Sequence, residues 1–292
     1  MGRRYDTVSF LTDYGLVDEF AGVVRSVIRD LAPHATVVDL THGIAPFDVR
    51  GGSLALARSI GYVASGVVLA VVDPGVGSAR RAVAIEVAGG EGVLVGPDNG
   101  LLAPAVALVG GAERAVELTN KEYQLATPSA TFAGRDVFGP AAAHLCNGVD
   151  LLDLGAEIDI DLLMPGVVPL AQTDDHLVIA QVLWIDTFGN VQLNVGPDDI
   201  PAGFGEQIAM RTSDPTDLTG GTTRSARLAE SFAAIGAGAV GLIVDSSGLY
   251  AIAMDRRSAA EELALGVGDQ VTLTADESGG PGVTQRVTLR GH

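Results

Sequence analysis

The sequence predicts an α/β domain followed by a smaller, mainly antiparallel β domain. Three observations support this. Near-continuous apolar strands alternate with helical patterns early in the chain, as in a parallel sheet covered on both faces. From about Asp161 the pattern changes to short strands punctuated by turns. Apolar residues make up 47% of the 292 residues and charged residues only 18%, enough for a sizeable core. We expect one domain over residues 1–165 and another over 166–292.

The first domain begins with a βαβ unit. A short apolar strand covers residues 8–11. Apolar residues then recur at helical spacing over 20–31, which places them on one face of a helix that Pro33 stops. A second strand follows over 36–40.

The rest of this domain continues the alternation of strands and helices. Its predicted elements are a helix around 54–57, a strand over 67–72, two strands within 82–96 joined by a Gly-rich turn, and a last helix over 135–145.

The segment 165–169 contains two prolines and is predicted to be a linker. Beyond it, turn residues separate short apolar runs, which is typical of a small barrel or sandwich. The predicted strands are 178–185, 191–195, 239–244 and 249–253, with one helix near 259–265.

The charge balance excludes several classes of partner. Eighteen Lys and Arg residues against 36 Asp and Glu give a net charge of −18, which opposes binding to nucleic acid or to an anionic membrane. No uncharged stretch approaches the roughly 20 residues of a membrane span, and no signal segment precedes the first strand, so we expect a cytoplasmic protein. The single cysteine, Cys146, permits no internal disulfide.

Polar residues follow each of the first three predicted strands. They are Thr12-Asp13, Thr41-His42 and Asp73-Pro74-Gly75. Ligands of open α/β sheets bind beyond the carboxyl ends of the strands, so we expect all three clusters to line one pocket.

Asp73 begins a tight loop that supplies Arg80 seven residues later. A carboxylate and a guanidinium that converge on one pocket can hold a water between them, with the carboxylate accepting its proton. A structural salt bridge that closes the loop is the alternative interpretation.

Asp13 stands where a dinucleotide-binding protein would carry a Gly-rich phosphate loop. A carboxylate there suits neutral hydroxyls such as a ribose diol, although it can equally organise an Asx-turn. Phe47 lies in the loop after the second predicted strand, and Phe132 lies where the last helix begins. Both rings could cover a flat ligand, or they could belong to the core.

In the second domain, Asp186, Phe188 and Asn190 combine an acid, a ring and an amide at a strand end. The trio could bind the edge and face of a purine, or form an ordinary hairpin turn. Of the five histidines no pair has metal-ligand spacing, so we expect no metal site.

Taken together, these segments resemble the S-adenosylmethionine hydroxide adenosyltransferases, a family related to the fluorinases and chlorinases. Nine runs in the same order, spread over both domains, carry the resemblance. They are 11–15, 41–42, 45–49, 72–78, 95–102, 132–136, 185–186, 188–191 and 246–248.

The resemblance implies hydrolysis of S-adenosylmethionine to adenosine and methionine by attack at C5′, with no cofactor. Asp73 and Arg80 match the positions that handle the water. The halogenases carry an aromatic residue where Asp73 stands, and a carboxylate there would repel a halide, which favours hydrolysis over the halogenase alternative.

The resemblance also implies a β-barrel second domain and a homotrimer, in which the first domain binds substrate and performs catalysis while the second completes the site of a neighbouring subunit. The implied substrate contacts are Asp13 for the ribose hydroxyls, Phe47 and Phe132 for the ribose and C5′ region, Asp186, Phe188 and Asn190 for the methionine and adenine parts, and Ser246 for the methionine carboxylate.

One position departs from the family pattern. Hydrolytic relatives generally read Phe-His-Gly-Arg-Asp where this chain reads Phe132-Ala133-Gly134-Arg135-Asp136. Ala133, which we expect to line the substrate site, cannot bind a water or relay its proton. The change is consistent with a natural variant that uses another group, with an engineered mutant, or with a protein that binds S-adenosylmethionine or adenosine and turns it over poorly.

Overall fold

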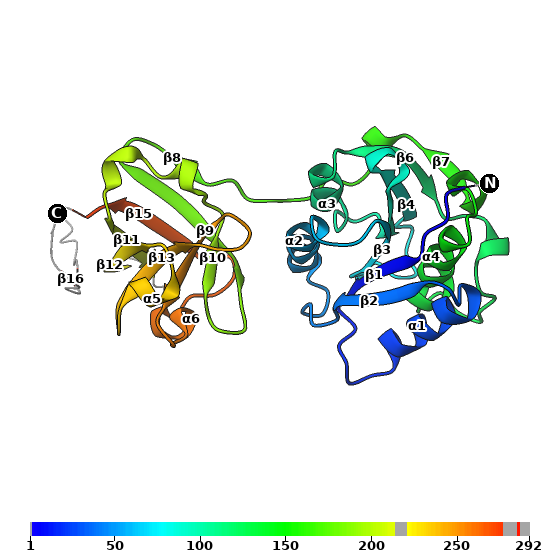
Figure 1. The fold of residues 1–292 in the computed structure, drawn as a ribbon, viewed down its shortest axis with the longest axis horizontal. Coiled ribbons are helices and arrows are strands. Elements are labelled where there is room, and N and C mark those ends of the chain that lie inside the picture. The colour runs from blue at the N-terminus through cyan, green and yellow to red at the C-terminus, as the bar shows by residue number, and fades with distance from the viewer. Residues whose placement is uncertain (1, 214–220, 277–284, 287–292) are drawn as a thin grey trace. The chain divides into compact units, whose positions relative to one another are not determined.

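The computed structural model describes residues 2–213, 221–276 and 285–286. The chain folds into two compact units, Met1–Val168 and Pro169–His292 (Figure 1). Among the described residues, every helix is too short or too polar to cross a lipid bilayer.

The first unit is built on a mainly parallel, seven-stranded sheet with the order β2-β1-β3-β5-β4-β6-β7. The neighbours β2, β1, β3 and β5 are parallel, whereas β4 runs antiparallel to both β5 and β6. The strands are β1 Thr7–Thr12, β2 Thr36–Thr41, β3 Gly66–Val71, β4 Ala82–Val87, β5 Gly92–Pro97, β6 Ala112–Glu117 and β7 Ala156–Ile158.

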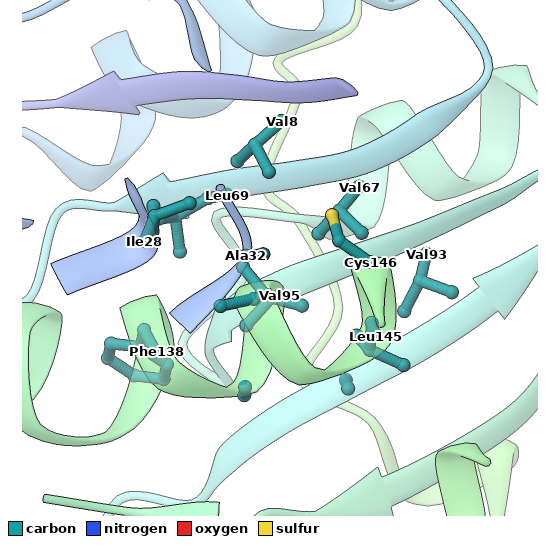
Figure 2. Close-up of a cluster of buried hydrophobic side chains, with 14 of the residues drawn as sticks. Val8, Ile28, Ala32, Val67, Leu69, Val93, Val95, Phe138, Leu145 and Cys146 are labelled. Carbon is teal, nitrogen blue, oxygen red and sulfur yellow. The ribbon is translucent and has the colours of Figure 1, made fainter. Parts of the chain in front are cut away.

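Helices cover both faces of this sheet, as the sequence predicts. Alternate residues of β3 enter two different cores: Val67 and Leu69 pack with α1 and α4, and Val68 and Ala70 pack with α2 and α3. Figure 2 shows the first of these cores, which includes Cys146. The helices are α1 Phe20–Leu31, α2 Val49–Ile60, α3 Ala103–Leu108 and α4 Gly139–Cys146. Burial on both sides explains why β3 is apolar throughout.

Several elements of the first unit differ from the sequence prediction. The helix predicted over 135–145 begins as a π-helical turn, Gly134–Phe138, before it continues as α4. The short helix α3 and the strands β6 and β7 were not predicted, because α3 spans only six residues and β6 carries charged side chains.

The second unit is a β-barrel. Its sheet has the order β10-β14-β13-β12-β11-β15-β9, and pairing of β9 with β10 closes the ring. The pairings of the ring are antiparallel except β12 with β13. The strands of the ring are β9 Leu177–Ile185, β10 Val191–Leu193, β11 Gln207–Ser213, β12 Gly221–Ala229, β13 Val240–Val244, β14 Tyr250–Met254 and β15 Gln270–Ala275.

Smaller elements decorate the barrel. The strand β8 (Gln172–Thr173) pairs with β9, and β16 (Gln285–Arg286) pairs with β12. The helices α5 (Phe232–Ile235) and α6 (Ala259–Leu263) complete the unit. The sequence prediction omitted β11, β12 and β15, whose exposed faces carry polar residues.

Candidate active site

A cavity of about 440 Å³ lies at the carboxyl edge of the first unit's sheet. The loops that follow β1, β2 and β3 supply most of its wall, and the segment before α4 supplies the rest. Its lining residues are Asp13, Tyr14, Asp18, Phe20, Pro46, Phe47, Asp73, Val76, Thr131, Phe132, Ala133 and Gly134. Five of the residues predicted from sequence therefore share one cavity: Asp13, Phe47, Asp73, Phe132 and Ala133.

Asp73 is held by Arg80 in a bidentate ion pair. Arg80 Nε donates to Asp73 Oδ1 at 2.9 Å, and Nη2 contacts Oδ2. The two side chains are only 6% and 13% exposed, and the guanidinium also lies 5.2 Å from the ring centre of Phe138. A carboxylate has more lone pairs than this pair uses, so Asp73 can still accept a hydrogen bond from a water in the cavity.

Asp13 is fixed by the loop that follows β2. The backbone N–H of Phe47 donates to Asp13 Oδ2 at 2.9 Å. Phe47 adopts a left-handed backbone with φ 68°, which is strained for a bulky residue and directs its amide at the carboxylate. The described residues donate no hydrogen bond to Asp13 Oδ1, so this oxygen can accept bonds from a ligand.

Three aromatic rings form one wall. Tyr14, Phe20 and Phe132 lie with ring centres 5.1 to 5.9 Å apart in tilted or edge-on geometry. The guanidinium of Arg135 lies 5.2 Å from the centre of the Phe132 ring. These contacts place Phe132 at the cavity with little freedom to turn away.

Tyr14 was not among the residues singled out from sequence. The sequence signal for a role in the site was that Tyr14 directly follows the polar pair Thr12-Asp13 after β1. An aromatic residue at such a position is equally typical of the core. Burial, together with the carboxylates of Asp13 and Asp73, raises the pKa of its hydroxyl, and Arg80 lowers it by a smaller amount. The hydroxyl therefore stays protonated at neutral pH.

The cavity carries an excess of negative charge. Asp13, Asp18 and Asp73 line it, whereas Arg80, a neighbouring cation, is paired with Asp73. Such a site favours a cationic ligand over an anion. Asp18, on the exposed loop before α1, was also missed from sequence. Among the residues that the structure describes, no group of three or more His, Cys, Asp or Glu side chains could hold a metal ion.

The prediction that Thr41-His42 lines the same pocket is wrong. His42 is only 4% exposed, its Nδ1 lies 2.8 Å from the Thr12 hydroxyl, and neither Thr41 nor His42 is among the residues that line the cavity. The carbonyl of His42 accepts a hydrogen bond from Gly15 N–H at 2.8 Å. The cluster therefore supports the loop of Asp13, and the β2 loop reaches the cavity through Pro46 and Phe47 instead.

The barrel residues predicted from sequence occupy two turns. Asp186 organises the turn between β9 and β10: its Oδ1 accepts from the backbone N–H groups of Phe188 and Asn190, and its Oδ2 accepts from the Asn190 side chain at 2.7 Å. This is an Asx-type hairpin turn. It leaves the Phe188 ring 79% exposed.

Ser246 lies in a different turn, between β13 and β14. Because β10 and β14 are antiparallel and each begins after its turn, the two turns lie at opposite ends of this strand pair. Asp245, which sequence analysis did not select, organises the second turn by accepting from Ser247 N–H at 2.8 Å and from Gln192 Nε2 at 2.5 Å. Ser246 itself is exposed.

A second cavity, of about 280 Å³, lies beside β4, β5 and α3. Aliphatic side chains form most of its wall. Two carboxylates line it: Asp161, and Asp98, which already pairs with Arg81, whose Nε lies 2.9 Å from Asp98 Oδ2. It therefore has fewer lining carboxylates than the cavity of Asp73, which has three.

Comparison with known proteins identifies the family. The model of the SAM hydroxide adenosyltransferase N-terminal domain matches residues 8–155, and that of the C-terminal domain matches residues 180–272. The chain belongs to the SAM hydroxide adenosyltransferase family. The resemblance found in the sequence is thereby confirmed.

Relatives within and beside this family cover nearly the whole chain. An (R)-S-adenosyl-L-methionine hydrolase of Salinispora arenicola is 44% identical over 92% of this chain and 97% of its own length. The protein of the same name from Thermus thermophilus is 39% identical over 91% of this chain and 98% of its own. A fluorinase of Actinoplanes is 28% identical over 91% of this chain and 97% of its own length. The chain is therefore more similar to these hydrolases than to this fluorinase.

Solved structures share the fold. An uncharacterized conserved protein from Thermotoga maritima superposes with a TM-score of 0.81 at 31% identity, over 91% of this chain and 99% of that one. A conserved hypothetical protein from Thermus thermophilus superposes with a TM-score of 0.70 at 35% identity, over 92% of this chain and 100% of that one.

Proposed function

We propose that this protein hydrolyses S-adenosyl-L-methionine to adenosine and L-methionine. The observation that carries the proposal is the bidentate Asp73–Arg80 pair on the cavity of a chain that belongs to this family. The hydrolase names of relatives at 39% and 44% identity support it.

In this reaction the oxygen of a water attacks C5′ of the substrate. The C5′–S bond breaks, and its electron pair goes to sulfur, which leaves as the neutral thioether of methionine. Asp73 accepts the proton of the water as it attacks, while Arg80 holds the carboxylate in place and stabilises hydroxide character. A sulfonium leaves without acid assistance, so the proposed mechanism uses no cofactor.

The remaining predicted residues have binding roles in this proposal. Asp13 accepts from the ribose hydroxyls through the oxygen that Phe47 leaves free, and Phe47 and Phe132 cover the ribose and C5′ region. Ala133 lines the same region without a polar group. The negative lining of the cavity suits the sulfonium and the ammonium group of the substrate.

We further propose a homotrimer in which the barrel of one chain completes the cavity of the next. Asp186, Phe188 and Asn190 would contact the methionine and adenine parts, and Ser246 the methionine carboxylate. The exposed ring of Phe188 is consistent with a partner at that turn. Light scattering tests the assembly: the expected mass is that of three 29.8 kDa chains. We place the enzyme in the cytoplasm, which cell fractionation tests.

The activity is tested by incubating the full chain with S-adenosylmethionine in heavy-oxygen water. Adenosine and methionine should form in equal amounts, and the label should appear in the 5′-hydroxyl of adenosine. Tight binding by calorimetry without adenosine above the spontaneous background would instead indicate a binding protein, the alternative that Ala133 favours.

A further inference from the structure

We propose that the hydroxyl of Tyr14 holds and orients the attacking water. The family pattern that the sequence resembles has a histidine at position 133, where this chain has an alanine. The inference rests on the proposed hydrolysis and adds a catalytic residue to it.

The first observation is where Tyr14 is held. It lines the cavity together with Asp73 and Ala133. Its ring is fixed from two sides by Phe20 and Phe132, with ring centres 5.9 and 5.8 Å away. Its backbone N–H donates to the Thr12 hydroxyl at 3.1 Å, so the main chain is anchored as well. A side chain fixed in this way presents its hydroxyl at one place in the cavity.

The second observation is where that hydroxyl lies. A Cβ built on Gly134 would stand 2.2 Å from Tyr14 Oη. The phenol oxygen therefore occupies the space that a side chain at position 134 would take, next to Ala133. Within the part of the chain that the structure describes, the oxygen forms no hydrogen bond. A largely buried hydroxyl without a protein partner can bond to a molecule in the cavity.

Electrostatics limits what this hydroxyl can do. Burial and the carboxylates of Asp13 and Asp73 raise its pKa, so it does not lose its proton near neutral pH. It can donate one hydrogen bond and accept another, but it cannot serve as the base. The water's proton therefore goes to Asp73, and Tyr14 fixes the direction of the oxygen's lone pair toward C5′.

The test is Tyr14→Phe in the full chain, because phenylalanine keeps the ring contacts and removes only the oxygen. We expect kcat for adenosine formation to fall about 100-fold, with KM and the calorimetric affinity for S-adenosylmethionine changed less than about threefold. Tyr123→Phe is the matched control. Tyr123 packs edge-on against His144, with ring centres 4.9 Å apart, and is not among the residues that line the cavity, so its variant should keep full activity.

A rescue distinguishes this role from a structural one. Ala133→His places an imidazole on the same cavity, so the double variant Tyr14→Phe/Ala133→His should recover at least about tenfold in kcat over Tyr14→Phe alone. Gly134→Ala offers a second route, because its methyl group would displace the hydroxyl while Tyr14 is retained. It should lower kcat in the same way.

Three results would overturn the inference. They are a kcat within about threefold of the wild type for Tyr14→Phe, a loss of affinity with unchanged kcat, or a double variant no more active than Tyr14→Phe. Failure of the proposed function gives a different result, because the wild-type chain itself would then form no adenosine.

Discussion

Arg80 holds both carboxylate oxygens of Asp73, with Nε 2.9 Å from Oδ1, at the carboxyl end of a strand that is buried on both faces. A second pair, Arg81 with Asp98, lies nearby in the chain and is also largely buried, with side chains 27% and 5% exposed. Asp73 lines the cavity of the candidate active site and Asp98 does not. The two pairs therefore allow the chemical role of an ion pair to be separated from its structural role.

Asp73→Asn should lower adenosine formation by about 100-fold or more, because an amide cannot accept the proton of the attacking water. It should also lower the free energy of unfolding, because Arg80 loses its charged partner. Asp98→Asn should lower the free energy of unfolding by a similar amount and leave adenosine formation unchanged. Kinetics and urea denaturation of both variants check this, and equal activity losses would assign Asp73 a structural role only.

Phe47 provides a test of backbone strain. At its φ of 68°, the folded state of a non-glycine residue is destabilised by roughly 1 kcal/mol, whereas glycine adopts this backbone conformation without strain. Phe47→Gly should therefore be more stable than Phe47→Ala by about 1 kcal/mol in urea denaturation. Both variants lose the ring, so both should bind S-adenosylmethionine more weakly. Equal stability of the two variants would show that the left-handed backbone is not strained.

Cys146 should make the stability fall at alkaline pH. Burial, with a smaller contribution from Asp6, raises the pKa of its thiol from 9.0 to about 12. The unfolded chain ionises first, so the stability from this group is complete below pH 9 and is lost as the pH rises toward 12. Between pH 8 and pH 10 the wild type should lose about 1 kcal/mol more than Cys146→Ala. Parallel pH profiles in urea denaturation would contradict this.

Halide should not replace water as the nucleophile. A carboxylate lies on the cavity at Asp73, and Arg80 is already paired with it. The described residues that line the cavity include no cation, so an anion would meet repulsion there. With chloride or fluoride added, chromatography should show adenosine and no 5′-halo-5′-deoxyadenosine. Any halogenated product would favour the halogenase alternative.

Much of the first unit could be predicted because burial on both faces leaves a strong sequence signal. The apolar run of β3 and the helical spacing of α1 identify these elements without knowledge of their partners. Parallel strands also place their ends at one edge, which is why Asp13 and Asp73 were expected to share a cavity.

The parts that were missed depend on tertiary contacts. The alternation in β11, where Ile208 and Met210 are buried between more exposed neighbours, was a usable signal, but the polar residues of the strand obscured it. His42 was misplaced because a polar residue at a strand end can point into the cavity or behind it. The position of the Tyr14 hydroxyl depends on Gly134, which lies 120 positions further along the chain, and no local pattern reveals such a contact.

The close approach of Tyr14 to Gly134 also constrains how this family can diverge. The phenol oxygen and any side chain at 134 compete for one volume, since even a methyl group would stand 2.2 Å from that oxygen. Homologues should therefore change these two positions together, with a smaller residue at 14 wherever 134 gains a side chain. A side chain at position 134 would therefore exclude the Tyr14 hydroxyl from its place next to Ala133.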